Sequence, residues 1–124
     1  MLENSLIIKY FVDKARTLSL EFFQQQKMAF ELGLGDYFTE DIANDWIDED
    51  IYLLKELLAK GIVNERVLDI YIRINDNFAS VSLGGEMYDE NIWTLTGLKS
   101  DPFWEKQRGL ACELLNQLKE ISQK

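Results

Sequence analysis

Histidine is absent from the 124-residue sequence, and cysteine and proline occur once each. Without an imidazole the chain cannot build a Ser-His-Asp or Cys-His catalytic arrangement, and it lacks the commonest general base. A typical zinc site is excluded as well, because it needs histidine or several cysteines. The lone Cys112 cannot form an internal disulfide, which fits a reducing compartment. Hydrolysis by the familiar mechanisms is therefore not expected.

Long apolar runs are also missing. No window approaches the roughly 20 apolar residues that cross a bilayer, and residues 1–9 lack the basic-then-apolar layout of a secretory signal peptide. These absences predict a cytoplasmic protein outside the membrane. Gly84-Gly85 stands without a P-loop or dinucleotide fingerprint and is read as a turn, so no cofactor is expected.

Basic residues are scarce in the middle of the chain. The whole sequence has 22 acidic and 13 basic residues and a net charge of −9. Residues 28–98 hold 15 of the acids and 4 of the bases, whereas the two flanks together hold 7 acids and 9 bases. Such a charge repels phosphate backbones and anionic lipids, so neither a nucleic acid nor a membrane is an expected partner.

The apolar residues that are present recur mainly at helical spacing. With 47% hydrophobic residues and a length near that of one domain, residues 1–124 are expected to form a single domain. Its predicted fold class is all-α, a compact bundle of about four to five helices, with a possible short hairpin near residues 70–83 as the alternative.

Several residues mark the expected helix ends. One long helix is predicted over residues 4–30, ending before Gly33 and Gly35. Thr39 is a candidate N-cap for a second helix starting near residue 40. This helix either continues or restarts at Asp48-Glu49-Asp50, and Gly61 ends it.

The second half carries further signals. Asn64 is expected to cap a helix that ends near Val81, although Ile70, Ile72 and Ile74 within it also alternate as in a strand. A short element is expected to end at Gly97. Asp101-Pro102 predicts the start of a last helix reaching about Ser122.

Four residues of the C-terminal region receive individual roles. Trp104 is expected in the core with Trp93 as a loop plug against it, and Cys112 is expected to be a small buried hydrophobe. Arg108 is expected to pair with a nearby carboxylate.

One run stands out for function. Residues 28–54 contain eight acids and no lysine or arginine, interleaved with aromatic residues. A solubilising face usually mixes both signs, whereas a field of one sign with aromatics can steer and anchor a basic protein. Both readings, a solvated face and a binding face, stay open, as does Trp46 as either core residue or interface anchor. The candidate partner-binding residues are Asp36, Tyr37, Asp41, Asp45, Trp46, Asp48, Glu49, Asp50, Glu86, Asp89 and Glu90.

Carboxylates can also hold Mg²⁺, which opens an enzymatic alternative. Asp41, Asp45, Asp48 and Glu49 would share one face of a continuous helix, and Glu86 and Asp89 are three residues apart. Similar spacings occur in all-helical nucleotide pyrophosphohydrolases. Their second Glu-rich motif is not found here, and no EF-hand loop is present, so no metal site is assigned.

The segment from Asp89 to Leu98, centred on Ile92-Trp93-Thr94 and followed by Pro102-Phe103-Trp104, Arg108 and Ala111, resembles the C-terminal part of small bacterial immunity proteins. The resemblance is confined to the C-terminal third. It implies neutralisation of a toxin by tight binding over its active site, often with acids standing in for a nucleic-acid backbone. The matched residues look structural, so no binding residue is carried over.

The leading hypothesis is a non-catalytic inhibitor or immunity protein whose acidic face neutralises a basic, nuclease-like toxin. The alternatives are the Mg²⁺-dependent pyrophosphohydrolase and a structural or oligomerising helical domain. The oligomeric state is left open.

Overall fold

The computed structural model describes residues 3–46 and 50–122. These residues contain no strand and form seven α-helices and one 3-10 helix, so the all-α prediction is confirmed, while the expected four to five helices are too few. In chain order the elements are α1 (Asn4–Ser19), α2 (Phe22–Leu32), α3 (Tyr37–Asn44), α4 (Ile51–Ala59), α5 (Glu65–Val81), η1 (Glu90–Trp93), α6 (Leu95–Ser100) and α7 (Pro102–Ser122).

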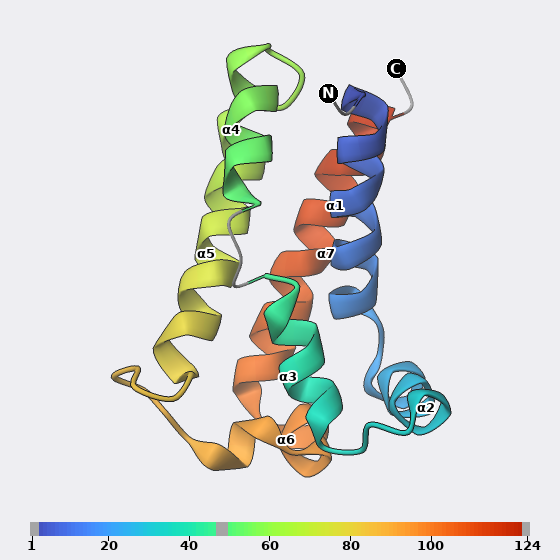
Figure 1. Ribbon diagram of the computed structural model, residues 1–124, viewed down its shortest axis with the longest axis vertical. Helices are drawn as coiled ribbons and strands as arrows, with labels where there is room; N and C mark the ends of the chain where they lie inside the picture. Colours follow the sequence, from blue (N-terminus) through green and yellow to red (C-terminus); the bar gives the residue numbers. More distant parts are fainter. Residues whose placement is uncertain (1–2, 47–49, 123–124) are drawn as a thin grey trace.

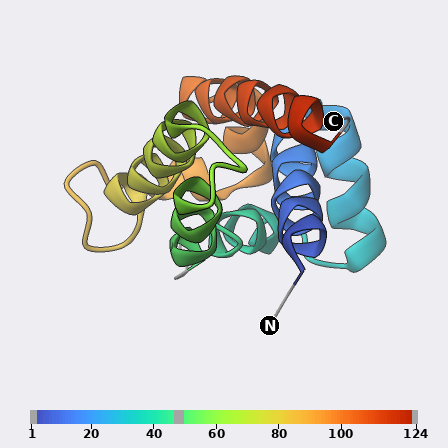
Figure 2. The same cartoon turned by 90° about the horizontal axis from the view of Figure 1, so that it is seen from above.

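The long helices form the frame (Figure 1). α1 and α7 lie side by side and run in opposite directions, so the start of α1 and the end of α7 lie at the same end of the molecule. α4 and α5 form a second antiparallel pair, and α5 packs on α7. Seen from above, the helices enclose a common interior (Figure 2). None of the described helices combines the length and apolar composition needed to cross a membrane.

Aromatic residues pack the end of the molecule near α6. Trp104 is fully buried and donates from its indole Nε1 to the Ile92 carbonyl at 2.8 Å. Trp93 meets it edge to face, with ring centroids 6.0 Å apart, and donates to the Val81 carbonyl at 3.0 Å. The expected plug of Trp93 against Trp104 is confirmed.

The predicted long helix over residues 4–30 is wrong, because the chain breaks after Ser19. Leu20 and Glu21 adopt extended backbone conformations, and α2 starts at Phe22. The buried Gln25 side chain donates to the carbonyls of Thr17 and Leu18 at 3.1 and 3.2 Å. The Gln25 side chain thus replaces the backbone hydrogen bonds that a continued helix would have made to these carbonyls. The spacing of apolar residues in the sequence does not reveal this replacement.

The break at the glycines is confirmed, since Gly33 has a φ of 69° and ends α2. Thr39 is not the N-cap of the next helix. It lies inside α3, fully buried, and its hydroxyl donates to the Asp36 carbonyl at 2.8 Å. α3 stops at Asn44 and α4 begins at Ile51, so one continuous helix is ruled out. Gly61 follows α4 as expected, with a φ of 73°.

Residues 65–81 are helical, so the hairpin alternative near residues 70–83 is wrong. The Asn64 side chain accepts from the Val67 amide at 3.1 Å, which confirms the expected cap. The helical spacing decides the outcome, because Ile70, Ile74 and Phe78 all reach the core on one face of α5.

The start of the last helix is confirmed: the Asp101 carboxylate accepts from the Phe103 amide at 2.9 Å, and α7 begins at Pro102. Gly97 does not end an element as expected, because it lies within α6. Cys112 is exposed on α7, so its expected burial is wrong. Arg108 also differs from expectation: its guanidinium hydrogen-bonds the Gln25 side chain and the Leu98 carbonyl rather than a carboxylate.

Candidate functional site

Several exposed carboxylates of the acidic middle lie on α3, directly after its end, and in the segment before and within η1. We call five of them, Glu40, Asp41, Asp45, Glu86 and Glu90, the acidic surface. All five residues are exposed. Within the described part of the chain, none of their carboxylates forms an ion pair or a side-chain hydrogen bond. Their negative charge is therefore available to solvent or to a partner.

Two of the predicted residues sit at the start of α3. The Asp36 carboxylate accepts from the Leu95 amide at 2.7 Å and so ties α3 to the first turn of α6. Tyr37 is 71% exposed and remains a candidate contact residue. Asp36 thus fixes one end of α3, although its side chain still reaches the surface.

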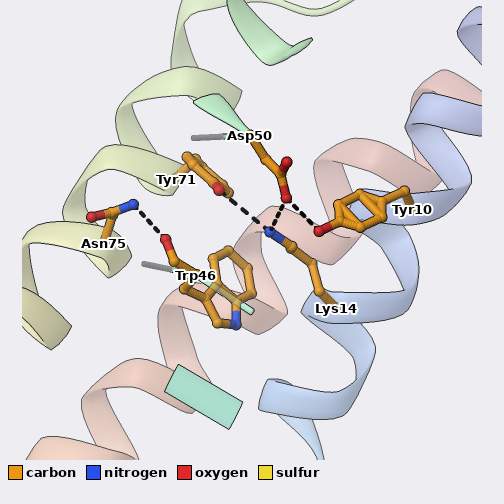
Figure 3. Close-up of polar contacts among 6 residues, drawn as sticks. All are labelled: Tyr10, Lys14, Trp46, Asp50, Tyr71 and Asn75. Atoms are coloured by element: carbon orange, nitrogen blue, oxygen red, sulfur yellow. Dashed lines mark hydrogen bonds and ion pairs between the residues drawn. The ribbon is translucent and has the colours of Figure 1, made fainter. Parts of the chain in front are cut away.

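Trp46 belongs to the core and is not an exposed anchor. Only 1% of its surface is accessible, and its ring lies 5.4 Å from that of Tyr71, centroid to centroid. Its backbone carbonyl accepts a hydrogen bond from the Asn75 side chain on α5 (Figure 3). Of the two sequence interpretations of Trp46, the core interpretation holds, and the residue anchors the end of α3.

Asp50, just before α4, is engaged within the protein. Its carboxylate accepts a hydrogen bond from the Tyr10 hydroxyl and lies 3.6 Å from the Lys14 ammonium (Figure 3). Asp50 is only half-buried and could still meet solvent. Its main contribution is to fix the point where the chain re-enters a helix.

The Lys14 ammonium is the centre of this cluster. Lys14 is 5% exposed and donates to the Tyr71 hydroxyl at 3.3 Å. Its nitrogen also lies 4.8 to 5.2 Å from the ring centroids of four aromatic residues, Tyr10, Phe11, Trp46 and Tyr71. A desolvated ammonium is stabilised by such rings and by an opposite charge. Lys14 therefore holds α1, α5 and both flanks of residues 47–49 together.

Asp45 occupies an unfavourable place for a negative charge. Partial burial raises the pKa of its carboxyl above the ordinary value of 3.8, the charge of Asp41 raises the pKa further, and nearby Lys14 opposes the change. Asp45 also follows the last turn of α3, where the helix dipole disfavours an anion. The fold keeps this carboxylate at an energetic cost.

A hollow separates the two acid-bearing segments. It has a volume of about 300 Å³. α3 contributes one wall and the segment after α5 contributes the other, with the lining residues Glu40, Ala43, Asn44, Ser82, Leu83, Tyr88 and Trp93. The structure thus brings α3 and residues 82–93 to one site, which sequence spacing alone did not indicate.

Two further candidates, Asp48 and Glu49, lie outside the described residues. α3 ends before Asp45, so the continuous helix on which a shared face of Asp41, Asp45, Asp48 and Glu49 depended is not formed. The Asp89 carboxylate caps η1 by accepting from the Asn91 amide at 3.0 Å. Among the described residues, no three carboxylate or thiol side chains are grouped as a metal site.

Sequence reasoning missed Lys14 and Glu40 as functional positions. Lys14 interrupts the buried series Phe11, Ala15 and Leu18 of α1, and a lysine at such a position signals burial with a partner. In the sequence, Glu40 is one of the eight acids of residues 28–54, and no local pattern sets it apart from the others. Its place at the hollow depends on how residues 82–93 fold back, which no local pattern encodes.

Comparison with known proteins gave no relative: the chain matches no family model, no curated protein and no solved structure.

Proposed function

We propose that this protein is a non-catalytic inhibitor, of the immunity-protein kind, that binds a basic protein through its acidic surface. The supporting observation is that five exposed carboxylates on two segments beside one hollow form no ion pair and no side-chain hydrogen bond within the described chain. A cognate toxin of nuclease type is the proposed partner, since a surface that binds nucleic acid is basic. No cofactor is part of the proposal.

The attachment of α3 at both ends supports a binding role over a purely solubilising one. Asp36 ties the start of α3 to α6, and Asn75 holds the Trp46 carbonyl just beyond its end. A charged surface that is fixed before association loses less conformational entropy on binding. Solubility alone would need neither attachment.

Asp45 also supports a binding role over a purely solubilising one. Its raised pKa means that the ionised side chain destabilises the folded protein at neutral pH. A residue that costs stability at an exposed position is more readily explained by binding than by folding.

Capture from a lysate of the native host tests the proposal, with wild-type protein and two variants as baits. The first variant neutralises four acids of the acidic surface, as Asp41→Asn, Asp45→Asn, Glu86→Gln and Glu90→Gln. The matched control neutralises four exposed acids elsewhere, as Glu56→Gln, Asp69→Asn, Asp76→Asn and Glu120→Gln. Asp36, Asp50 and Asp89 stay unchanged because their carboxylates make structural hydrogen bonds.

The expected result is a basic protein, identified by mass spectrometry, that wild type and control capture and the first variant does not. Circular dichroism should show both variants to be folded. Equal capture of the same protein by all three baits would contradict the proposal, as would specific capture of acidic proteins only.

A second candidate function, self-association, is favoured by α2. Phe23 and Phe30 are 70% and 86% exposed, and their seven-residue spacing places them on one face of the helix. Sedimentation at several concentrations tests it: a dimer that Phe23→Ser with Phe30→Ser dissociates, while Tyr52→Ser on α4 does not, would support this candidate. A concentration-independent monomer would remove it.

A further inference from the structure

The chemistry of the hollow between α3 and residues 82–93 narrows what it can receive. Its walls include the apolar side chains of Ala43 and Leu83 and the rings of Tyr88 and Trp93. Glu40 supplies one carboxylate, and Asn44 supplies an amide. Among the described residues that line the hollow, none is basic. The site therefore combines aromatic and aliphatic contact area with a single negative charge.

The walls differ in how firmly they are held. The Trp93 ring is fixed by its hydrogen bond to the Val81 carbonyl and by its contact with the Trp104 ring. Leu83, by contrast, is 86% exposed at the rim. The Glu40 carboxylate has no ion pair or side-chain hydrogen bond within the described chain. A side chain that enters the hollow would thus contact the fixed ring of Trp93 and the unpaired carboxylate of Glu40.

We propose that this hollow receives an arginine side chain of the protein partner, with its guanidinium against the Glu40 carboxylate and its aliphatic stem between Leu83, Tyr88 and Trp93. Arginine fits these walls because its planar cation stacks on aromatic rings and bonds a carboxylate through two N–H groups. A volume of about 300 Å³ lies at the lower end for ligand pockets, which suits one long side chain. The surrounding acids add attraction for a basic segment.

This inference rests on the proposed function, since it names the anchor within the same binding surface. The two can fail separately. If neutralising Asp41, Asp45, Glu86 and Glu90 abolishes capture of the partner but Glu40→Gln leaves it unchanged, the acidic surface binds and the arginine site is wrong.

A direct test uses a short peptide whose only charged group is one arginine side chain, titrated into isotopically labelled protein and followed by NMR at constant ionic strength. The same peptide with citrulline, the neutral analogue of arginine, is the ligand control. We expect shifts at the Trp93 indole and at Ala43 and Asn44 with the arginine peptide only. Glu40→Gln should weaken binding about tenfold or more, since it removes a charge-assisted hydrogen bond.

The protein control is Asp41→Asn, which neutralises a neighbouring acid on α3 that does not line the hollow. It should change the affinity less than Glu40→Gln does. Equal shifts with arginine and citrulline, equal loss in the two variants, or no shift at the hollow would each overturn the arginine site.

Discussion

The Lys14 ammonium on α1 lies 3.6 Å from the Asp50 carboxylate and 5.1 Å from the centroid of the Trp46 ring. One buried cation therefore contacts both residues that border positions 47–49. Through these contacts, the helix that starts the chain fixes the end of α3 and the beginning of α4. The three residues of the acidic surface that lie on or directly after α3, Glu40, Asp41 and Asp45, depend on this anchor for their position.

Replacing Lys14 tests the anchor. Lys14→Met keeps much of the side-chain volume but leaves Asp50 and Tyr71 without their cation. We expect a fall of about 2 kcal/mol in the free energy of unfolding, below the roughly 3–5 kcal/mol for a fully buried pair because Asp50 keeps partial solvent access. Urea unfolding measures it, and the exposed Lys9→Met is the control. Equal effects of the two substitutions would refute the anchoring role.

Gln25 offers a second test, at the break between α1 and α2. Its side-chain amide nitrogen donates hydrogen bonds to the carbonyls of Thr17 and Leu18, while its side-chain oxygen accepts from Arg108 at 2.9 and 3.1 Å. Gln25→Met leaves these groups unsatisfied, so we expect a loss of about 1–3 kcal/mol in unfolding free energy. Gln24→Met, at an exposed position, should be nearly neutral. A stable Gln25→Met protein would show that the break does not need this side chain.

Gly97 lies where α6 approaches the backbone of η1 closely, and substitutions at this glycine test that packing. A Cβ atom at Gly97 would lie 2.1 Å from the Asn91 carbonyl oxygen, whereas one at Gly109 would meet nothing within 4 Å. We expect Gly97→Ala to lower stability by about 1–3 kcal/mol, as overpacking does, and Gly109→Ala to raise it by about 0.5–1 kcal/mol. Thermal unfolding checks both. The same sign for both substitutions would contradict the packing at Gly97.

Asp45 gives a pH dependence with a defined sign. Because its pKa is raised in the folded state, the folded protein binds more protons than the unfolded chain between the ordinary value of 3.8 and the raised one. Its contribution to stability therefore falls as the pH rises through that window. Asp45→Asn should be more stable than wild type at neutral pH, by less than about 1 kcal/mol given its exposure.

This advantage should shrink as the pH falls toward 3.8. Unfolding curves over that range measure it, with Asp69→Asn as the control, since Asp69 is exposed on α5. A wild type that is more stable than Asp45→Asn at neutral pH would reverse the sign and remove the strain at this residue.

Much of the helical content follows from local chemistry. Asn64 and Asp101 cap helices where expected, and Gly33 and Gly61 adopt positive φ. The helical spacing of apolar residues predicts α5 correctly, although Ile70, Ile72 and Ile74 also alternate as in a strand. Each of these signals acts within a few residues, so the sequence suffices to predict it.

The failures come from long-range contacts. The first helix breaks where the Gln25 side chain, itself bonded by Arg108 of α7, takes over the hydrogen bonds of α1 carbonyls. Thr39 looked like a cap but is buried within α3. Neither outcome can be seen without the packed neighbours.

The candidate site, too, has a part that local charge patterning predicts and a part that depends on long-range contacts. Charge patterning selected Asp41, Asp45, Glu86 and Glu90, which the structure exposes, but it could not separate them from Asp50, whose carboxylate faces Tyr10 and Lys14. It also missed Glu40 and the hollow, because these arise only when residues 82–93 return to α3.

The central claim is that the acidic surface drives association with a basic protein. The most direct measurement is the association rate constant between the captured partner and this protein, at low and at high salt. For wild type we predict a fall of roughly tenfold or more, because electrostatic steering is screened within a Debye length of about 8 Å at physiological ionic strength. The variant lacking the charges of Asp41, Asp45, Glu86 and Glu90 should associate slowly at both salt concentrations. Equal, salt-independent rate constants for wild type and variant would contradict the claim.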